Sequence, residues 1–132
     1  MTEPIRVLQV LPNLDRGGVE ADLLSAMDAM MFPSRYEGLG IALVEAQASD
    51  LPCVAADTLP NAVGLTDLVR FIPLDQPDDA WAKAVLEARL TGDRASRTDE
   101  FRSAGYDSAQ IAHAMQHLYL SLAESKSAKA RR

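Results

Sequence analysis

The chain has 132 residues, and its 48% hydrophobic and 24% charged content is typical of one soluble globular domain. Its formal net charge of −6 argues against a nucleic-acid partner, because phosphate contacts need a basic surface. No apolar run approaches the roughly 20 residues needed to cross a bilayer, and the N-terminal run lacks the basic leader and cleavage site of a signal peptide. We therefore expect a cytoplasmic protein, with its single cysteine, Cys53, buried in the core.

The first predicted unit is a strand, a glycine loop and a helix. The apolar run at residues 5–11 ends at Pro12 and predicts a buried parallel strand. Gly17 and Gly18 follow in a polar loop, and they fit either a close backbone approach to a phosphate or a simple tight turn. Apolar residues then recur at helical spacing, at Val19, Leu23, Leu24 and Met27.

The rest of the chain alternates between predicted helices and strands. Residues 28–32 fit either a strand or a continuation of the preceding helix. Further strands are predicted at residues 52–56 and 69–72, and helices at 39–49, from Pro77 to Gly92, at 98–105 and from Asp107 onward. We expect Trp81 to be a core residue. The last helix carries one apolar stripe, at Ile111, Met115, Leu118, Tyr119 and Leu122.

One glycine-containing segment, residues 34–46, carries the strongest functional signal. It places Glu37 in a loop and Glu45, eight positions later, inside a predicted helix. Gly38 and Gly40 allow backbone N–H groups to approach a phosphate at the helix N-terminus. The second glutamate is placed to accept hydrogen bonds from hydroxyls, as a carboxylate does for ribose in dinucleotide folds. A nucleotide-sugar fits this arrangement.

Several segments together resemble a known enzyme family. Residues 32–48, 51–60 and 68–75 resemble the donor-binding segment of retaining GT-B fold glycosyltransferases, and more narrowly the family 4 enzymes that build capsular and exopolysaccharides. Residues 17–20 also have a close counterpart in the first unit of that family. The resemblance implies an α/β fold with a small parallel sheet and flanking helices, corresponding to the Rossmann-like, donor-binding half of such an enzyme. It also favours a strand at residues 28–32.

The resemblance also implies roles for individual residues. Glu37 would contact the donor sugar as the catalytic residue, and Glu45 would bind the ribose. The implied donor-binding residues are Arg35, Glu37, Gly38, Leu39, Gly40, Ile41 and Glu45. Without the resemblance, the two glutamates also fit an acidic helix start and a surface position. Arg16 and Arg35 are the basic residues nearest these loops and are candidates to neutralise a diphosphate.

The resemblance implies an unusual domain organisation. In the family, a long acceptor domain and the first half of the donor domain separate the glycine loop from the glutamate motif, whereas here Asp28 follows Glu20 closely. We interpret residues 1–27 as an N-terminal strand-loop-helix segment, 28–125 as a partial nucleotide-sugar-binding domain and 126–132 as a disordered basic tail. A natural internal deletion, a degenerate reading frame and an artificial junction all fit this organisation.

The implied function is transfer of a sugar from a UDP- or GDP-sugar to a saccharide or lipid-linked acceptor, with retention, in polysaccharide biosynthesis. No cofactor is implied, and His113 and His117 fit a solvated helix face better than a metal site. The basic residues that hold the diphosphate in the family are missing, so catalysis by this chain alone stays open. The alternatives are a non-catalytic nucleotide-binding module, or a ligand-free fragment that forms a homodimer. The basic tail also allows weak association with a membrane.

Overall fold

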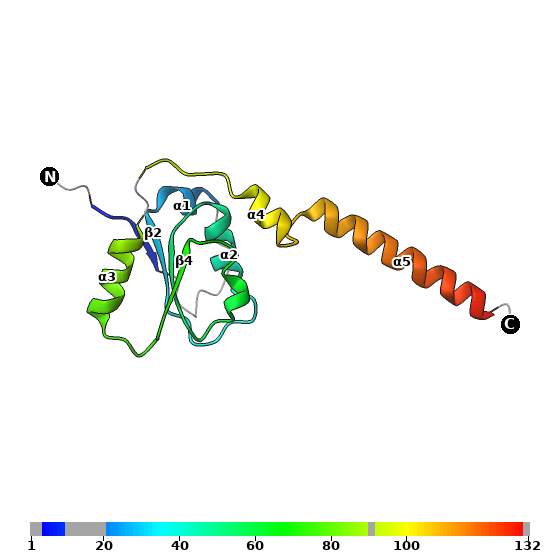
Figure 1. Ribbon diagram of the computed structural model, residues 1–132, viewed down its shortest axis with the longest axis horizontal. Helices are drawn as coiled ribbons and strands as arrows, with labels where there is room; N and C mark the ends of the chain where they lie inside the picture. The colour runs from blue at the N-terminus through cyan, green and yellow to red at the C-terminus, as the bar shows by residue number, and fades with distance from the viewer. Residues whose placement is uncertain (1–3, 10–20, 90–91, 131–132) are drawn as a thin grey trace. The chain divides into compact units, whose positions relative to one another are not determined.

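The computed structural model describes residues 4–9, 21–89 and 92–130. The chain divides after Thr98 into two compact units, which we describe separately (Figure 1). In chain order, the elements of the first unit are β1 (Val7–Gln9), α1 (Ala21–Ala26), β2 (Ala29–Phe32), α2 (Ile41–Ala48), β3 (Cys53–Ala56), the 3-10 helix η1 (Asn61–Val63), β4 (Val69–Ile72) and α3 (Asp78–Ala88). The helix α4 (Thr98–Ser103) begins at the boundary, and α5 (Ser108–Ala130) belongs to the second unit.

The strands form one parallel sheet in the order β1-β2-β3-β4. In register, Leu8 lies opposite Met30, Met30 opposite Cys53, and Cys53 opposite Val69. The predicted α/β class, with a small parallel sheet and flanking helices, is confirmed. Because Ala29–Phe32 is a strand, the alternative in which the first helix continues through these residues is wrong.

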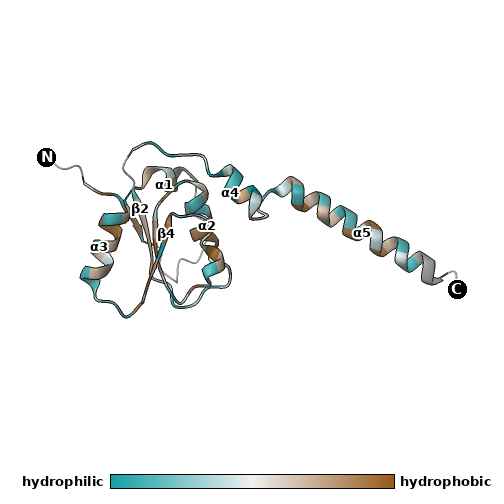
Figure 2. Ribbon diagram, viewed as in Figure 1, coloured by the Kyte–Doolittle hydropathy of each residue, from teal (hydrophilic) through white to brown (hydrophobic). Residues whose placement is uncertain are grey.

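Helices cover both faces of the sheet, as Figures 1 and 2 show. One face contacts α1, α2 and η1 through the buried residues Leu24, Met30, Phe32, Leu43, Ala46, Leu51, Cys53, Ala55, Leu59 and Val63. The other face packs on α3 through Ala29, Val54, Ala56, Trp81, Ala84 and Val85. Trp81 and Cys53 are therefore core residues, as predicted, and burial raises the pKa of the Cys53 thiol to about 12.

Several boundaries differ from those predicted. Only Val7–Gln9 of the first predicted strand is described as a strand, and residues 10–20 lie outside the described part of the chain. This strand was predicted to be buried, but Val7 and Gln9 are exposed because β1 is an edge strand. The helix predicted to close at Gly92 ends at Ala88, because Arg89 adopts an extended ψ of 143°. A helix cannot continue through a residue with that backbone conformation.

Two arginines hold the amino edge of the sheet, where the strands begin. Arg94 donates hydrogen bonds to the carbonyl oxygens of Leu24 (2.9 Å), Met27 (2.6 Å) and Ser49, at the ends of α1 and α2. The Asp50 carboxylate, which is 5% exposed, pairs with Arg97 at 2.6 Å. The Arg94 hydrogen bonds satisfy carbonyl groups that a helix end leaves without partners.

The second unit is dominated by α5. Asp107 caps its N-terminus, accepting hydrogen bonds from the N–H groups of Ala109 (2.9 Å) and Gln110 (3.1 Å). We predicted a disordered tail from residue 126, but in the structure α5 continues to Ala130. The tail sequence is rich in lysine and alanine, which are strong helix formers and allow the last turns to propagate.

Candidate functional site

The glutamate motif lies at the carboxyl edge of the sheet, in the connection between β2 and α2. Ser34, which is 2% exposed, fixes the start of this loop. Its hydroxyl donates to Glu37 Oε1 at 2.9 Å, and its carbonyl accepts from the Thr58 hydroxyl at 2.8 Å. In open parallel sheets, ligands bind outside the carboxyl ends of the strands. The loop that carries Glu37 is thus anchored from two sides at the edge where a ligand is expected.

Gly40 shapes the start of α2. Its φ of 61° and ψ of 46° are left-handed, and it is the N-cap of the helix without any side-chain cap. The first N–H groups of a helix have no partner within the helix, and the helix dipole adds positive character there. Gly38 leaves open space, since a Cβ built on it would meet nothing within 4 Å. Backbone and space are therefore available for an anion.

Glu45 lies on α2, about one turn beyond its first residue. Its Oε2 atom is buried and is the buried side-chain N or O atom that lacks a hydrogen-bond partner in the described part of the chain. A buried acceptor without a donor costs roughly 1–3 kcal/mol. A ligand hydroxyl that donated a hydrogen bond to this oxygen would remove that cost.

Gln47, two residues further along α2, is a structural residue that sequence reasoning missed. It is fully buried and donates to the carbonyl oxygens of Leu43 (3.0 Å) and Val63 (2.8 Å). Its own carbonyl accepts from the N–H groups of Leu65 (2.8 Å) and Thr66 (3.1 Å). The amide therefore ties α2 to the loop after η1 and holds the helix that bears Glu45. Three of these four partners lie 16 to 19 positions away in the chain, so they leave no local sequence signal.

The remaining predicted site residues surround the loop. Arg35 is exposed, and so are Leu39 (51%) and Ile41 (58%). Tyr36, which we did not assign to the site, is 91% exposed beside them. The structure thus brings Arg35, Glu37, Gly38, Leu39, Gly40, Ile41 and Glu45 into one loop and helix start. The predicted glycine loop (Gly17 and Gly18) and Arg16 lie outside the described residues. The structure therefore does not place them relative to the glutamate motif.

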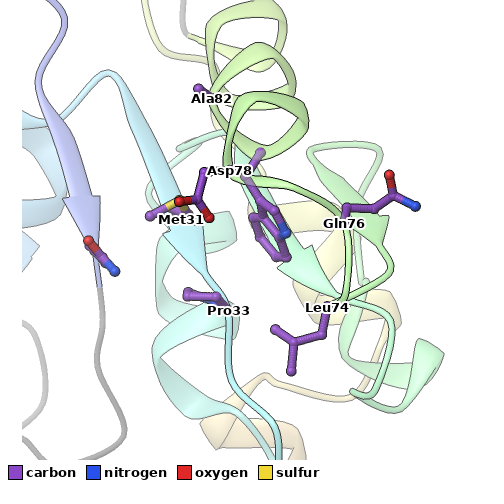
Figure 3. A pocket seen from close by; sticks show the side chains of 8 residues that line it. Met31, Pro33, Leu74, Gln76, Asp78 and Ala82 are labelled. Atoms are coloured by element: carbon purple, nitrogen blue, oxygen red, sulfur yellow. The ribbon is translucent and has the colours of Figure 1, made fainter.

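A cavity lies on the α3 side of the sheet, and Figure 3 shows its lining. Its volume is about 440 Å³, and its lining residues are Gln9, Met31, Pro33, Leu74, Gln76, Asp78, Trp81 and Ala82. Pro33 joins it to the glutamate loop, because the next residue is Ser34. Sequence analysis did not predict this cavity, since its residues come from separate segments.

No metal centre is evident in the described part of the chain. Its residues include no group of three or more histidine, cysteine, aspartate or glutamate side chains placed to hold an ion. His113 and His117 are exposed on α5, which agrees with a solvated helix face.

Comparison with known proteins identifies the class. Residues 10–89 match the model of the family described as "Glycosyl transferases group 1", and the chain belongs to this family. The parallel α/β fold agrees with the Rossmann-like half of a GT-B glycosyltransferase.

One curated relative is similar over most of the chain. This is the "Putative glycosyltransferase EpsF" of Bacillus subtilis (strain 168), which is 36% identical over 102 residues. The aligned region covers 74% of this chain but only 26% of that protein, so the chain spans about a quarter of its relative's length. No solved structure matches the chain. None of the described helices combines the length and apolar character needed to cross a membrane.

Proposed function

We propose that this chain binds the nucleotide-sugar donor of a retaining glycosyltransferase, a UDP- or GDP-sugar, at the carboxyl edge of its sheet. The observation that carries the proposal is the partnerless Oε2 of Glu45, about one turn from an uncapped helix start. The helix start offers N–H groups to the diphosphate, and Glu45 accepts hydrogen bonds from the ribose hydroxyls. The donor-binding residues are Arg35, Glu37, Gly38, Leu39, Gly40, Ile41 and Glu45. We assign this site to the part of the chain within residues 28–125.

Glu37 lies at the mouth of the loop, where the sugar beyond the diphosphate would be. We assign it the catalytic role of stabilising positive charge that develops on the sugar as the nucleotide leaves. Its position is maintained by the 2.9 Å hydrogen bond from Ser34. Arg35 carries the charge needed to compensate the departing diphosphate. No described residue engages its guanidinium in a hydrogen bond or ion pair, so the group is available.

The acceptor is proposed to be a saccharide or a lipid-linked saccharide in polysaccharide biosynthesis. Transfer between two sugars requires both substrates to be held in one water-excluding cleft. In our proposal, the described residues form the donor side of such a cleft. We therefore propose that this chain provides donor binding, and that full transfer needs a second surface to hold the acceptor.

Titration calorimetry with UDP, GDP and their sugars tests donor binding. We expect measurable binding that Glu45→Ala weakens by roughly tenfold to a hundredfold, the effect of losing hydrogen bonds to a charged group. Glu124→Ala is the matched control, because Glu124 is an exposed glutamate on α5. An absence of heat with every nucleotide would contradict the proposal and leave the ligand-free fragment.

The Glu37→Ala variant distinguishes the proposed role of Glu37 from that of Glu45. If Glu37 contacts the sugar, this variant binds the free nucleotide as tightly as the wild type but loses affinity for the nucleotide-sugar. Glu45→Ala should weaken both ligands equally. Slow hydrolysis of the nucleotide-sugar by the wild type, abolished in Glu37→Ala, would show catalysis. Binding without hydrolysis would instead support a non-catalytic module.

A further inference from the structure

The second unit presents an unpartnered apolar helix face. Every described side chain from Ser108 to Lys126 is exposed. Four large apolar residues, between 42% and 52% exposed, lie on one side of α5: Ile111, Met115, Leu118 and Leu122. Figure 2 shows the resulting mixture of apolar and polar residues along the helix. Apolar surface of this extent on a helix is a common mark of an interaction site.

The spacing of the four residues specifies the kind of partner. They follow one another at intervals of four, three and four positions. This is the alternation of the a and d positions of a coiled coil, so the stripe fits a second helix that lies nearly parallel to α5 along its length. Tyr119 lies beside the stripe at an adjacent position and extends the apolar surface. The serines Ser108 and Ser125 occupy the next positions of the same stripe at either end.

Charge at the two ends of the unit specifies the direction of that partner. Residues 99–107 carry three carboxylates and one arginine, whereas residues 124–132 carry four cations and one carboxylate. A second copy in the antiparallel direction would bring the basic end of one helix to the acidic end of the other. The two helix dipoles would also be opposed, which is favourable. A parallel copy would place like charges together at both ends.

We propose that α5 forms an antiparallel helix pair with α5 of a second copy of this chain. In this pair, Ile111 of one copy packs on Leu122 of the other, and Met115 packs on Leu118. Ser108 and Ser125 then face each other at both ends. The dimer does not depend on donor binding, because the stripe lies in the second unit and the glutamate motif in the first.

A membrane surface is a weaker fit to the same helix. Helices that lie on membranes carry lysine and arginine along their polar face. Between Ser108 and Ser125, α5 contains no lysine or arginine, and its cations are confined to the end of the chain. The charge pattern therefore favours a protein helix over anionic lipid.

Sedimentation velocity on the full chain tests the pairing. We expect a monomer–dimer equilibrium whose dissociation constant rises at least about tenfold in Leu118→Glu. The control is His113→Glu, which places the same charge on the opposite side of α5 and should leave the equilibrium unchanged. Far-UV circular dichroism checks that both variants retain α5. A wild type that stays monomeric at all concentrations overturns the proposal.

Disulfide trapping tests the direction. The native Cys53 is fully buried, so it does not compete with introduced thiols. An oxidised mixture of Ser108→Cys and Ser125→Cys should give the cross-linked heterodimer, whereas each variant alone should give little product. Efficient homodimers of each variant alone would show a parallel pair and overturn the proposed direction. Co-sedimentation of the monomer with anionic phosphatidylserine vesicles, lost in Leu118→Glu, would show a membrane surface instead.

Discussion

The two edges of the sheet differ in how their polar groups are satisfied. At the amino edge, Arg94 binds three carbonyl groups, and Asp50 is paired with Arg97. At the carboxyl edge, α2 begins without a side-chain cap and Glu45 Oε2 has no partner. Polar groups that are completed within the chain stabilise the fold, whereas incomplete ones are available to a ligand. The contrast separates the stabilising edge of this domain from its proposed binding edge.

The largest effect should come from Gln47, the amide that links α2 to the loop after η1. Gln47→Leu keeps a side chain of similar volume in the core. It leaves the N–H groups of Leu65 and Thr66 and the carbonyl group of Val63 without their hydrogen-bond partner. We expect a loss of about 4 kcal/mol in the free energy of unfolding, measured by urea denaturation. Gln76→Leu is the control, because Gln76 is exposed, and it should change stability little. Equal effects of the two variants would contradict the role of Gln47.

Arg94→Ala would break the amino edge itself. It removes the hydrogen-bond donor of the carbonyl groups of Leu24, Met27 and Ser49. Water can replace only some of these hydrogen bonds. We expect a loss of about 3 kcal/mol, with nucleotide affinity unchanged in the remaining folded protein. Arg102→Ala removes ion pairs on the surface of the second unit and should cost below about 1 kcal/mol. A selective loss of nucleotide binding in Arg94→Ala would contradict the separation of the two edges.

Acid should weaken the amino edge through one carboxylate. Burial pushes the pKa of Asp50 upward, but the Ala95 N–H and the Arg97 guanidinium outweigh it and hold this pKa below its ordinary value of 3.8. A lowered folded-state pKa gives stability that is present above the unfolded-state pKa. That contribution is lost as the pH falls through the folded-state pKa. When unfolding is measured from neutral to acidic pH, the free energy of unfolding should therefore fall more steeply in the wild type than in Asp50→Asn. Identical pH profiles for the two proteins would contradict this role of Asp50.

The smallest effect that we expect is the difference in stability between alanine substitutions at the two glycines of the loop. Gly40 has a left-handed φ of 61°, so Gly40→Ala should cost about 1 kcal/mol through backbone strain alone. Gly38 has no close neighbour and no such φ, so Gly38→Ala should leave stability nearly unchanged. Thermal unfolding of both variants measures the difference. If Gly38→Ala were the more destabilising change, the described loop conformation would be wrong.

Local patterns determined most of the first unit. Apolar runs predicted the strands Cys53–Ala56 and Val69–Ile72, and acidic residues after Pro77 predicted the start of α3. Residues 28–32 were ambiguous from their own pattern, because Met30 and Met31 suit a helix as well as a strand. The family resemblance favoured the strand, and pairing with both β1 and β3 decides it.

The glutamate motif was predicted from sequence because its residues are adjacent in the chain and share one loop and one helix start. The roles of Gln47 and Arg94 could not be predicted, since all but one of their partners lie 16 to 70 positions away. The cavity beside Trp81 could not be predicted either, because its lining comes from three separate stretches of the chain. The sequence by itself determined most of the elements, the family and the residues of the proposed donor site. Only the tertiary structure decided which polar groups are satisfied within the chain, because hydrogen bonds between distant residues depend on how the chain folds.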